Sequence, residues 1–482
     1  GPDDGFVTRV PASATVGYLP QEPDSRPAET VRGYLARRTG VADAAAELDA
    51  LTLALEHDPS LVDRYTAALE RFVALGGADL DHRVNAASDE VGLADGRLDA
   101  RMDGLSGGEA ARATLAALLL ARFDVFLLDE PTNNLDFDGL ERLERFLDTT
   151  PAGVVLVSHD RALLDRSVHR IVELDEHTRR ARGWAGGWSA YEAARERARA
   201  HEQAAYAQYA EERSRIEEQQ RRMQRWEQAG YGQGRKKKKS KDVAKAFDRK
   251  LSRLDASEKP WEPWRLQLAL SPQERSGDVV ARLEGAVVER GAFRLGPIDV
   301  DVRWGERLAV LGSNGSGKTT LLAALLGKVD LLAGRRFLGP GVVLGEVEQR
   351  RELFADGRVT LLERFGQAAE LRTTDARTLL AKFGLGAGDV VRAASSLSPG
   401  ERTRAVLALL MARGANCLVL DEPTNHLDLP AIEQLESALA AFEGTLVLVS
   451  HDRRLLETVE PTRAIDLDRA RAARDSGRAW LY

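Results

Sequence analysis

The run Leu128-Asp129-Glu130-Pro131-Thr132-Asn133 decides the fold, because it returns 292 residues later as Leu420-Asp421-Glu422-Pro423-Thr424-Asn425. Two further motifs repeat at the same offset: Leu105-Ser106-Gly107-Gly108-Glu109 with Leu397-Ser398-Pro399-Gly400-Glu401, and Val157-Ser158-His159-Asp160-Arg161 with Val449-Ser450-His451-Asp452-Arg453. Three motifs in one order and at one offset indicate a duplicated domain.

A fourth pair of motifs departs from this offset. Gly17-Tyr18-Leu19-Pro20-Gln21 matches Gly345-Glu346-Val347-Glu348-Gln349 at a separation of 328 residues. The first copy therefore carries about 36 more residues between Gln21 and Leu105. That stretch, roughly residues 41–83, is rich in Ala, Leu and Glu at helical spacing and predicts a lengthened helical subdomain.

The composition is that of a globular protein large enough for two or three domains. Of its 482 residues, 43% are hydrophobic and 30% charged, and no apolar run approaches the ~20 residues that a membrane helix needs. The chain opens Gly1-Pro2-Asp3-Asp4 without a basic and apolar leader, so we expect no secretion. Its single cysteine, Cys417, fits a reducing compartment, and its apolar surroundings predict a buried strand residue. These features predict a cytoplasmic protein.

A glycine-rich loop in the second copy predicts phosphate binding. It follows the apolar run Arg307-Leu308-Ala309-Val310-Leu311 and precedes a predicted helix, which is the context that such a loop needs. Backbone N–H groups of the loop and the helix N-terminus would cradle the phosphates of ATP, Lys318 would reach the β- and γ-phosphates, and the Thr319 hydroxyl would bind Mg²⁺. The alternative is a structural turn. The candidate ATP-binding residues are Gly312, Ser313, Asn314, Gly315, Ser316, Gly317, Lys318, Thr319 and Thr320.

The first copy has no such loop in the printed sequence. A lysine matching Lys318 would fall ahead of Gly1, so we expect the N-terminal lobe of the first copy to be cut off rather than degenerate.

Paired acids at two predicted strand ends supply the remaining chemistry. Asp421 is expected to hold Mg²⁺, and Glu422 to polarise the attacking water as a general base. Asp129 and Glu130 repeat this arrangement in the first copy. Two histidines, each at the end of an apolar run of strand type, are expected to sense the γ-phosphate: His159 and His451.

A basic segment separates the two copies. Residues 191–228 favour a long helix, three glycines at 230, 232 and 234 end it, and a second helical stretch is expected to about residue 257. Between residues 221 and 253 there are 13 Lys and Arg against 3 Asp and Glu. The pattern predicts a helical hairpin whose tip neutralises RNA phosphates and whose aromatic residues stack on bases, with a solvated loop as the alternative. The candidate RNA-binding residues are Arg222, Arg225, Trp226, Tyr231, Arg235, Lys236, Lys237, Lys238, Lys239, Lys241 and Lys245.

Together, the Ser-Gly-Gly-Glu motif, the Asp-Glu-Pro-Thr-Asn-x-Leu-Asp run and the histidine after the next strand resemble the nucleotide-binding domains of the ABC superfamily. The resemblance implies an α/β fold of two P-loop cassettes paired head to tail within one chain, with ATP between the phosphate loop of one cassette and the signature of the other. It implies that the second cassette's loop faces Ser106, Gly107 and Gly108. It also implies Mg²⁺ ligands at Thr319, Gln349, Asp421, Gln21 and Asp129.

The second signature departs from the family pattern. Ser398 and Gly400 flank Pro399, which has no N–H to donate, so the two sites are expected to differ in rate. Phe293 stands where the family places an adenine-stacking aromatic residue, and a core phenylalanine is the alternative.

Over essentially the whole chain, the sequence is similar to the ABC-F family, including Gly187-Trp188-Ser189-Ala190-Tyr191-Glu192 at the entry to the linker. The expected domains are residues 1–188, a hairpin linker at 189–272 and a second cassette at 273–482. The resemblance implies binding in the ribosomal exit site, with the linker tip toward peptidyl-tRNA and rRNA, and leaves a translation factor and an antibiotic-resistance protein as alternatives. A DNA-associated repair ATPase and the ATPase subunit of a transporter are less favoured, because the first often carries a C-terminal coiled coil and the second would lack the basic hairpin.

Overall fold

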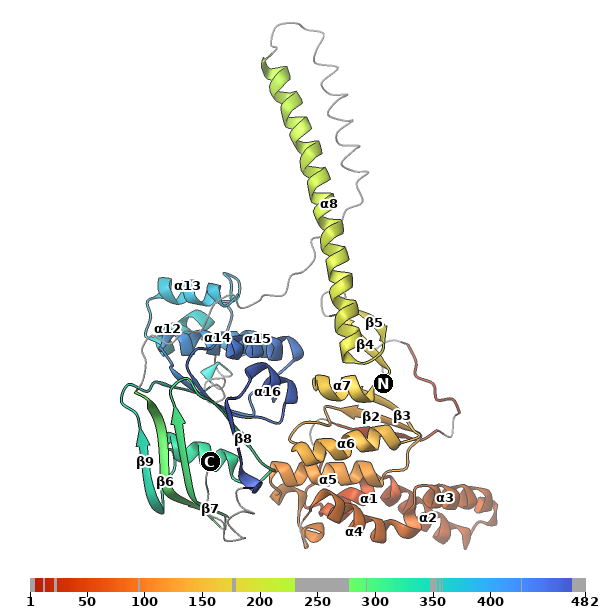
Figure 1. Ribbon diagram of the computed structural model, residues 1–482. Coiled ribbons are helices and arrows are strands. Elements are labelled where there is room, and N and C mark those ends of the chain that lie inside the picture. Colours follow the sequence, from red (N-terminus) through yellow and green to blue (C-terminus); the bar gives the residue numbers. More distant parts are fainter. Residues whose placement is uncertain are drawn as a thin grey trace. The chain divides into compact units, whose positions relative to one another are not determined.

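The computed structural model describes residues 5–11, 14–20, 24–93, 96–175, 179–229, 277–291, 293–346, 353–354, 357, 359–425 and 427–469. It divides into two compact units, one formed by Gly1–Leu163 with Arg265–Tyr482 and the other by Leu164–Trp264. The first unit contains the parallel sheets of both cassettes, and the second contains the end of the expected first cassette and the start of the linker. The elements are labelled in Figure 1. The expected domain boundaries at residues 188 and 272 stay predictions.

The first cassette is built on a parallel sheet in the order β1-β2-β3. Val16 of β1 pairs with Val125 of β2, which in turn pairs with Gly153 of β3. Apolar residues of the flanking helices, such as Tyr34 and Leu143, are buried in one core together with Leu128 of β2. The strands are β1 (Val16–Leu19), β2 (Val125–Asp129) and β3 (Gly153–Val157), and the helices beside them are α1 (Val31–Arg38), α5 (Gly107–Leu120), α6 (Phe137–Thr149) and α7 (Arg161–Ser167).

The lengthened helical subdomain is confirmed. Three helices occupy the stretch that the broken motif offset singles out: α2 (Val41–Leu55), α3 (Val62–Ala74) and α4 (Leu80–Val91). A small apolar cluster of Val41, Ala44 and Leu75 lies within it, and Phe123 packs there from the segment before β2.

The second cassette is built on a five-stranded parallel sheet in the order β10-β11-β12-β8-β13, together with an antiparallel sheet in the order β7-β6-β9. Its strands are β6 (Val279–Arg290), β7 (Phe293–Arg303), β8 (Arg307–Leu311), β9 (Ala333–Leu338), β10 (Leu344–Glu346), β11 (Cys417–Asp421), β12 (Thr445–Val449) and β13 (Arg463–Asp466). Its helices are α10 (Lys318–Leu326), α12 (Leu361–Ala369), α13 (Thr373–Lys382), α14 (Pro399–Ala412), α15 (Leu429–Ala440) and α16 (Arg453–Val459). Cys417 is buried in β11, as expected.

The two parallel sheets differ in how much of their apolar surface is covered. In the second cassette, Val447 and Val449 of β12 are buried, because β12 pairs with β8 and the core extends to α10. The matching residues of β3, Val155 and Val157, are more than half exposed in the part of the chain that the structure describes.

In the second unit, an antiparallel pair of strands leads into one long helix. β4 (Arg170–Asp175) pairs with β5 (Arg180–Ala185), and α8 (Trp188–Ala229) follows, which confirms the expected linker helix. At 42 residues, α8 is about 63 Å long. The Asp165 carboxylate fixes its start by accepting hydrogen bonds from the Ser189 backbone N–H and hydroxyl, each at 2.7 Å. Within the described residues, no helix is both long and apolar enough to cross a membrane.

Candidate functional site

The glycine-rich loop curls between β8 and α10, as the sequence predicts. Gly312, Gly315 and Gly317 have φ values of 144°, 84° and 106°, a region that side chains with a Cβ rarely enter. The curl turns backbone carbonyl groups toward the lysine at the start of α10. Lys318 Nζ donates to the carbonyl oxygens of Gly312 and Ser313, at 2.7 and 3.1 Å.

Several observations show that the loop fits a bound triphosphate. Lys318 is 8% exposed, and burial lowers the pKa of its ammonium group although nearby carboxylates, Glu422 foremost, raise it. Within the described part of the chain, the hydrogen bonds of this ammonium group go to neutral carbonyl oxygens, and such a buried cation gains from an anion beside it. The buried Ser316 hydroxyl has no hydrogen-bond partner among the described residues. The triphosphate of ATP would offer an anionic oxygen to Lys318, whose hydrogen bonds go to neutral carbonyl groups, and an acceptor to the Ser316 hydroxyl.

The residues expected at the metal lie together. Thr319 Oγ1 donates a hydrogen bond to Asp421 Oδ2 at 2.7 Å, so the hydroxyl at the start of α10 meets the carboxylate at the end of β11. Hydroxyl and carboxylate oxygens are ligands that suit Mg²⁺. In the first cassette, Asp129 Oδ2 instead accepts a hydrogen bond from the Tyr18 hydroxyl at 3.3 Å. Gln21 and Gln349 lie outside the described residues.

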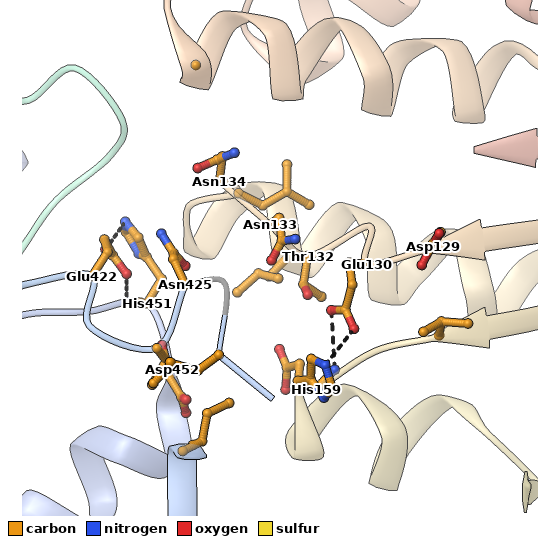
Figure 2. Close-up of a pocket in the computed structure, with 18 of the residues that line it drawn as sticks. Asp129, Glu130, Thr132, Asn133, Asn134, His159, Glu422, Asn425, His451 and Asp452 are labelled. Atoms are coloured by element: carbon orange, nitrogen blue, oxygen red, sulfur yellow. Dashed lines mark hydrogen bonds and ion pairs between the residues drawn. The ribbon is translucent and has the colours of Figure 1, made fainter. Parts of the chain in front are cut away.

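Each cassette places a glutamate beside a histidine in the same way (Figure 2). The His159 backbone N–H donates to Glu130 Oε2 at 3.3 Å, and the His451 backbone N–H donates to Glu422 Oε2 at 3.2 Å. The ring Nε2 atoms lie 3.4 and 3.5 Å from the second carboxylate oxygens.

Both glutamates also have an unusual backbone. Their φ values are 48° for Glu130 and 47° for Glu422, in the left-handed region that non-glycine residues seldom adopt. Each backbone N–H is held by the end of the neighbouring strand, through the carbonyl oxygens of Val157 and Val449 at 2.9 Å. Strain of this kind persists where the surrounding structure fixes it, and it gathers at functional sites.

Burial sets the protonation of these groups. It raises the pKa of Glu130 to about 7, with Asp129 and Asp160 adding to the effect and the His159 amide opposing it. Burial lowers the pKa of His451 to about 4, and the nearby Lys318 cation lowers it further. The Glu130 carboxyl group, which titrates near neutral pH, is suited to exchange protons with water, whereas His451 stays neutral at pH 7 and can donate a hydrogen bond.

Both signatures begin a helix with the same cap. The Ser106 side chain accepts the Glu109 backbone N–H at 3.3 Å, and Glu109 in turn accepts the Ser106 backbone N–H at 2.9 Å. This capping box leaves the N–H groups of Gly107 and Gly108 at the positive end of α5, where an anion is favoured.

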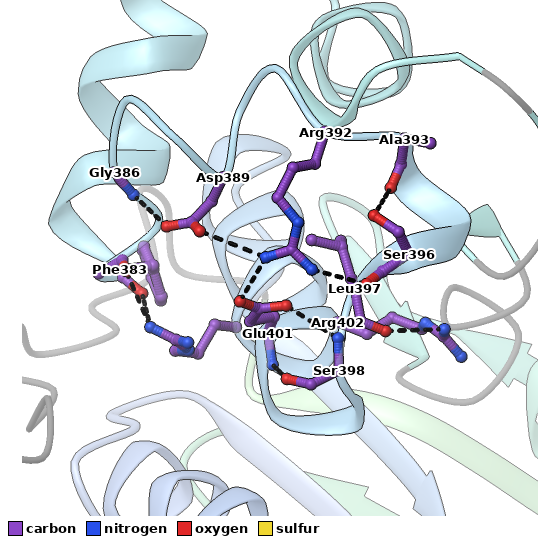
Figure 3. Close-up of polar contacts among 12 residues, drawn as sticks. Phe383, Gly386, Asp389, Arg392, Ala393, Ser396, Leu397, Ser398, Glu401 and Arg402 are labelled. Carbon is purple, nitrogen blue, oxygen red and sulfur yellow. Dashed lines mark hydrogen bonds and ion pairs between the residues drawn. The ribbon is translucent and has the colours of Figure 1, made fainter. Parts of the chain in front are cut away.

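In the second cassette, Ser398 caps α14 by the same reciprocal bonds to Glu401 (Figure 3). Arg392 braces Glu401 from the preceding loop, at 2.9 Å, and donates to the Ser396 carbonyl oxygen at 2.7 Å. Pro399 is the first residue of α14, where the cap tolerates it, but it offers no N–H to a ligand. Gly400 lies against Ala431 of its own cassette.

The second cassette's phosphate loop contacts the first cassette. The Asn314 backbone N–H donates to Asp136 Oδ2 at 2.9 Å, and its side-chain Nδ2 donates to the Asn134 carbonyl oxygen at 2.7 Å. A Cβ on Gly108 would lie 2.8 Å from Asn314 Cβ, so the glycine permits this close approach. The contacts bring together the loop of one cassette and the signature of the other, in the arrangement that the family resemblance implies.

A cavity of about 490 Å³ lies between the two glutamate–histidine pairs (Figure 2). It is lined by Glu130, His159, Glu422 and His451, and by the Asn residues that follow each glutamate, whereas Lys318 and Thr319 lie outside its lining. Both carboxylates therefore line one shared cavity.

The remaining candidates lie on the edges of the site or outside the described residues. Phe293 begins β7 and packs on the phosphate loop, since a Cβ on Gly317 would lie 2.8 Å from its ring. Thr320 is buried in the first turn of α10. Arg222 and Arg225 are exposed on α8. Nothing is described of the Trp226 side chain, and the other RNA-binding candidates lie outside the described residues: Tyr231, Arg235, Lys236, Lys237, Lys238, Lys239, Lys241 and Lys245.

Two carboxylates near the loop were missed by the sequence reasoning. Asp468 holds the Ser313 backbone N–H at 2.5 Å and its hydroxyl at 2.8 Å. Asp136 ends the repeated acidic run and matches Asp428 at the 292-residue offset, which is the signal that could have identified it. Asp468 lies among residues that the motif repeat does not reach, so no comparable signal exists.

Comparison with known proteins agrees with this geometry. The family model described as ABC transporter matches residues 7–133 and 295–425. The chain is 33% identical to the energy-dependent translational throttle protein EttA of Haemophilus influenzae, over 97% of this chain and 82% of that protein. It is 30% identical to ABC transporter F family member 5 of Arabidopsis thaliana, over 95% of this chain and 66% of that protein.

Among solved structures, the fold is similar to that of the RNase-L Inhibitor, with a TM-score of 0.51 and 22% identity over 82% of this chain and 67% of that one. The duplicated motifs, the α/β cassettes and these relatives agree, and the chain belongs to the ABC-F family of twin-cassette ABC ATPases.

Proposed function

We propose that this ATPase acts on the ribosome, as a translation factor of the ABC-F type, and that ATP bound between its cassettes controls that action. The likeness to an energy-dependent translational throttle protein over 97% of the chain supports translation as the process. The observation that carries the ATP-dependent part is the contact of Asn314 with Asp136 and Gly108, because it joins a phosphate loop to an opposing signature. The cytoplasm, where ribosomes work, is the proposed location.

In this proposal the described residues divide the work of one composite site. Lys318 and the loop N–H groups hold the β- and γ-phosphates, while Ser106, Gly107 and Gly108 meet the γ-phosphate from the opposite side. Thr319 Oγ1 and the Asp421 carboxylate would hold the metal, and bound Mg²⁺ would neutralise charge on the phosphate oxygens. Phe293 would stack on the adenine.

Glu422 and His451 are the proposed groups for the hydrolytic step. The Glu422 carboxylate accepts a proton from the attacking water, and neutral His451 donates a hydrogen bond toward the γ-phosphate. Glu130 and His159 have the same geometry and are proposed to act in the other site, opposite Ser398 and Gly400.

The test is a trapped form of the full-length protein that carries Glu130→Gln and Glu422→Gln. Removing both proposed bases should leave ATP binding intact and lower hydrolysis at least about 100-fold, as for other general bases. With ATP present, the trapped form should sediment with ribosomes, and with ADP it should not. Trapped protein that stays free of ribosomes at low salt and binds duplex DNA would replace this proposal with a repair function.

The basic tip is proposed to contact RNA. Changing Lys236, Lys237, Lys238 and Lys239 to alanine removes four cations, so ribosome binding should weaken and depend less on salt, while ATP binding stays at the parental level. A matched control changes four exposed arginines or lysines elsewhere. Equal ribosome binding by parent and tip variant at every salt concentration would remove the tip from the proposal.

A further inference from the structure

Two arginine–glutamate pairs join the cassettes, and the 292-residue offset converts one pair into the other. Arg453 of the second cassette donates from Nη1 to Glu144 Oε1 of the first, at 2.7 Å. Arg161 of the first cassette is hydrogen-bonded to Glu436 of the second. Because Arg161 matches Arg453 and Glu144 matches Glu436, the two pairs are reciprocal.

The arginines follow the candidate phosphate-sensing histidines closely. Arg161 begins α7 two residues after His159, and Arg453 begins α16 two residues after His451. The glutamates lie within α6 and α15, the helices that follow each repeated acidic run. Each pair therefore joins the segment after the histidine in one cassette to the helix after the acidic run in the other.

Helix α6 contacts the second cassette at two separate places. At its N-cap, Asp136 accepts the Asn314 N–H of the phosphate loop, and eight residues later, about 12 Å along the helix, Glu144 accepts Arg453. One rigid element of the first cassette thus spans two segments of the second that would contact the same nucleotide. A displacement of the phosphate loop relative to the His451 segment would break one of these contacts.

The burial of these four side chains indicates that the pairs determine the relative position of the docked cassettes more than they add to the free energy of docking. The Arg161 and Glu436 side chains are 4% and 8% exposed, and the Arg453 and Glu144 side chains 28% and 14%. Removing such charges from water costs much of what their attraction returns, whereas leaving one of them without its partner is strongly unfavourable. Among docked arrangements of the two cassettes, one that pairs both charges avoids this penalty.

We propose that Arg453–Glu144 and Arg161–Glu436 form a reciprocal interlock, and that these four positioning residues couple docking of the cassettes to the placement of each histidine segment. The interlock selects the docked register that completes the composite ATP site, because other docked registers would bury a charge without its partner. It does not depend on which partner the ATPase acts on, so it can stand if the ribosome proposal fails.

The experiment measures docking directly, in the full-length protein with the Glu422→Gln change. Cysteines replace Leu53 and Arg335, which are strongly exposed and lie in different cassettes, and each carries a spin label. Pulsed EPR then reports the distance between the cassettes. The native Cys417 is buried, so the label should react with the two introduced cysteines instead. Either single reversal, Arg453→Glu or Glu144→Arg, should raise the ATP concentration needed for half-maximal docking about tenfold. The double variant with both reversals should return it to within about threefold of the parent.

Glu141→Arg is the matched control, since it makes the same charge change on α6 at an exposed residue that pairs within its own cassette. It should dock like the parent. Parental docking by both single reversals, or a double variant no better than the singles, would overturn the interlock. If a reversal prevents folding, Arg453→Gln and Glu144→Gln replace it in a double-mutant cycle, where strictly additive effects would overturn the proposal.

Discussion

Replacing Glu130 by glutamine should change how the stability of the protein depends on pH. Glu130 is 8% exposed, and burial raises the pKa of its carboxyl group from an ordinary 4.5 to about 7. Glutamine has nearly the same shape, can still accept the His159 backbone N–H, and does not ionise. The comparison therefore isolates the cost of ionising this one group in the folded protein.

The sign follows from proton uptake. Between pH 4.5 and 7 the folded protein keeps a proton on Glu130 that the unfolded chain has lost, so this group's contribution to stability is present at low pH and falls as pH rises. The difference of about 2.5 between the two pKa values, at about 1.4 kcal/mol for each pH unit, corresponds to about 3 kcal/mol. Most of it, about 2.5 kcal/mol, is lost between pH 5 and pH 8.

This contribution of Glu130 to the free energy of unfolding can be measured by urea unfolding. The parent and Glu130→Gln are unfolded at pH 5, 6, 7 and 8 and followed by circular dichroism. The glutamine variant should gain about 2 to 3 kcal/mol relative to the parent as pH rises from 5 to 8. Glu109→Gln is the control, because its carboxylate is held below its ordinary pKa: burial would raise that pKa, but bonds from Ser106 and Arg97 outweigh it. The difference in the free energy of unfolding between Glu109→Gln and the parent should stay constant from pH 5 to pH 8. A flat difference for Glu130→Gln as well would refute the reasoning.

Three further predictions concern binding and packing. Lys318→Ala should weaken ATP binding at least about tenfold in a fluorescent-nucleotide titration, because it removes the buried cation that is proposed to bind the phosphates. Gly108→Ala should weaken ATP-dependent docking measured by EPR, since its Cβ would lie 2.8 Å from Asn314, whereas Gly107→Ala has nothing within 4 Å and should create no clash. Leu143→Ala, at a fully buried position in α6, should cost about 2–5 kcal/mol in urea unfolding.

The sequence predicted those parts of the fold that depend on local pattern. The apolar run at residues 307–311 is β8, and the long alanine- and glutamate-rich stretch is α8. The offset that placed extra helices after Gln21 was equally reliable, because an insertion changes spacing whatever its structure. Motifs of this kind carry their own conformational requirement, as the positive φ values of Gly312 and Gly317 illustrate.

Contacts between distant segments could not be predicted in this way. The Ser313–Asp468 bonds join residues 155 positions apart, and the Arg161–Glu436 pair joins residues 275 positions apart. Nothing in the local sequence of an aspartate after β13 distinguishes a loop brace from a solvated charge. The raised pKa of Glu130 could not be predicted from the sequence either, because it depends on how deeply the end of β2 is buried.

Duplication preserved backbone geometry more strictly than the groups that would touch a ligand. Both glutamates have a left-handed backbone, both amides bond to the neighbouring strand, and both signatures have the same capping box. Yet Pro399 has lost the N–H that Gly107 keeps, and the His159 side chain is 42% exposed where that of His451 is 10%. A capping box tolerates proline at the first helical position, so folding places no constraint on this change. The N–H that Gly107 has and Pro399 lacks therefore affects the groups offered to a ligand and leaves the helix itself unchanged. A difference of this kind would let two sites with the same backbone hydrolyse ATP at different rates.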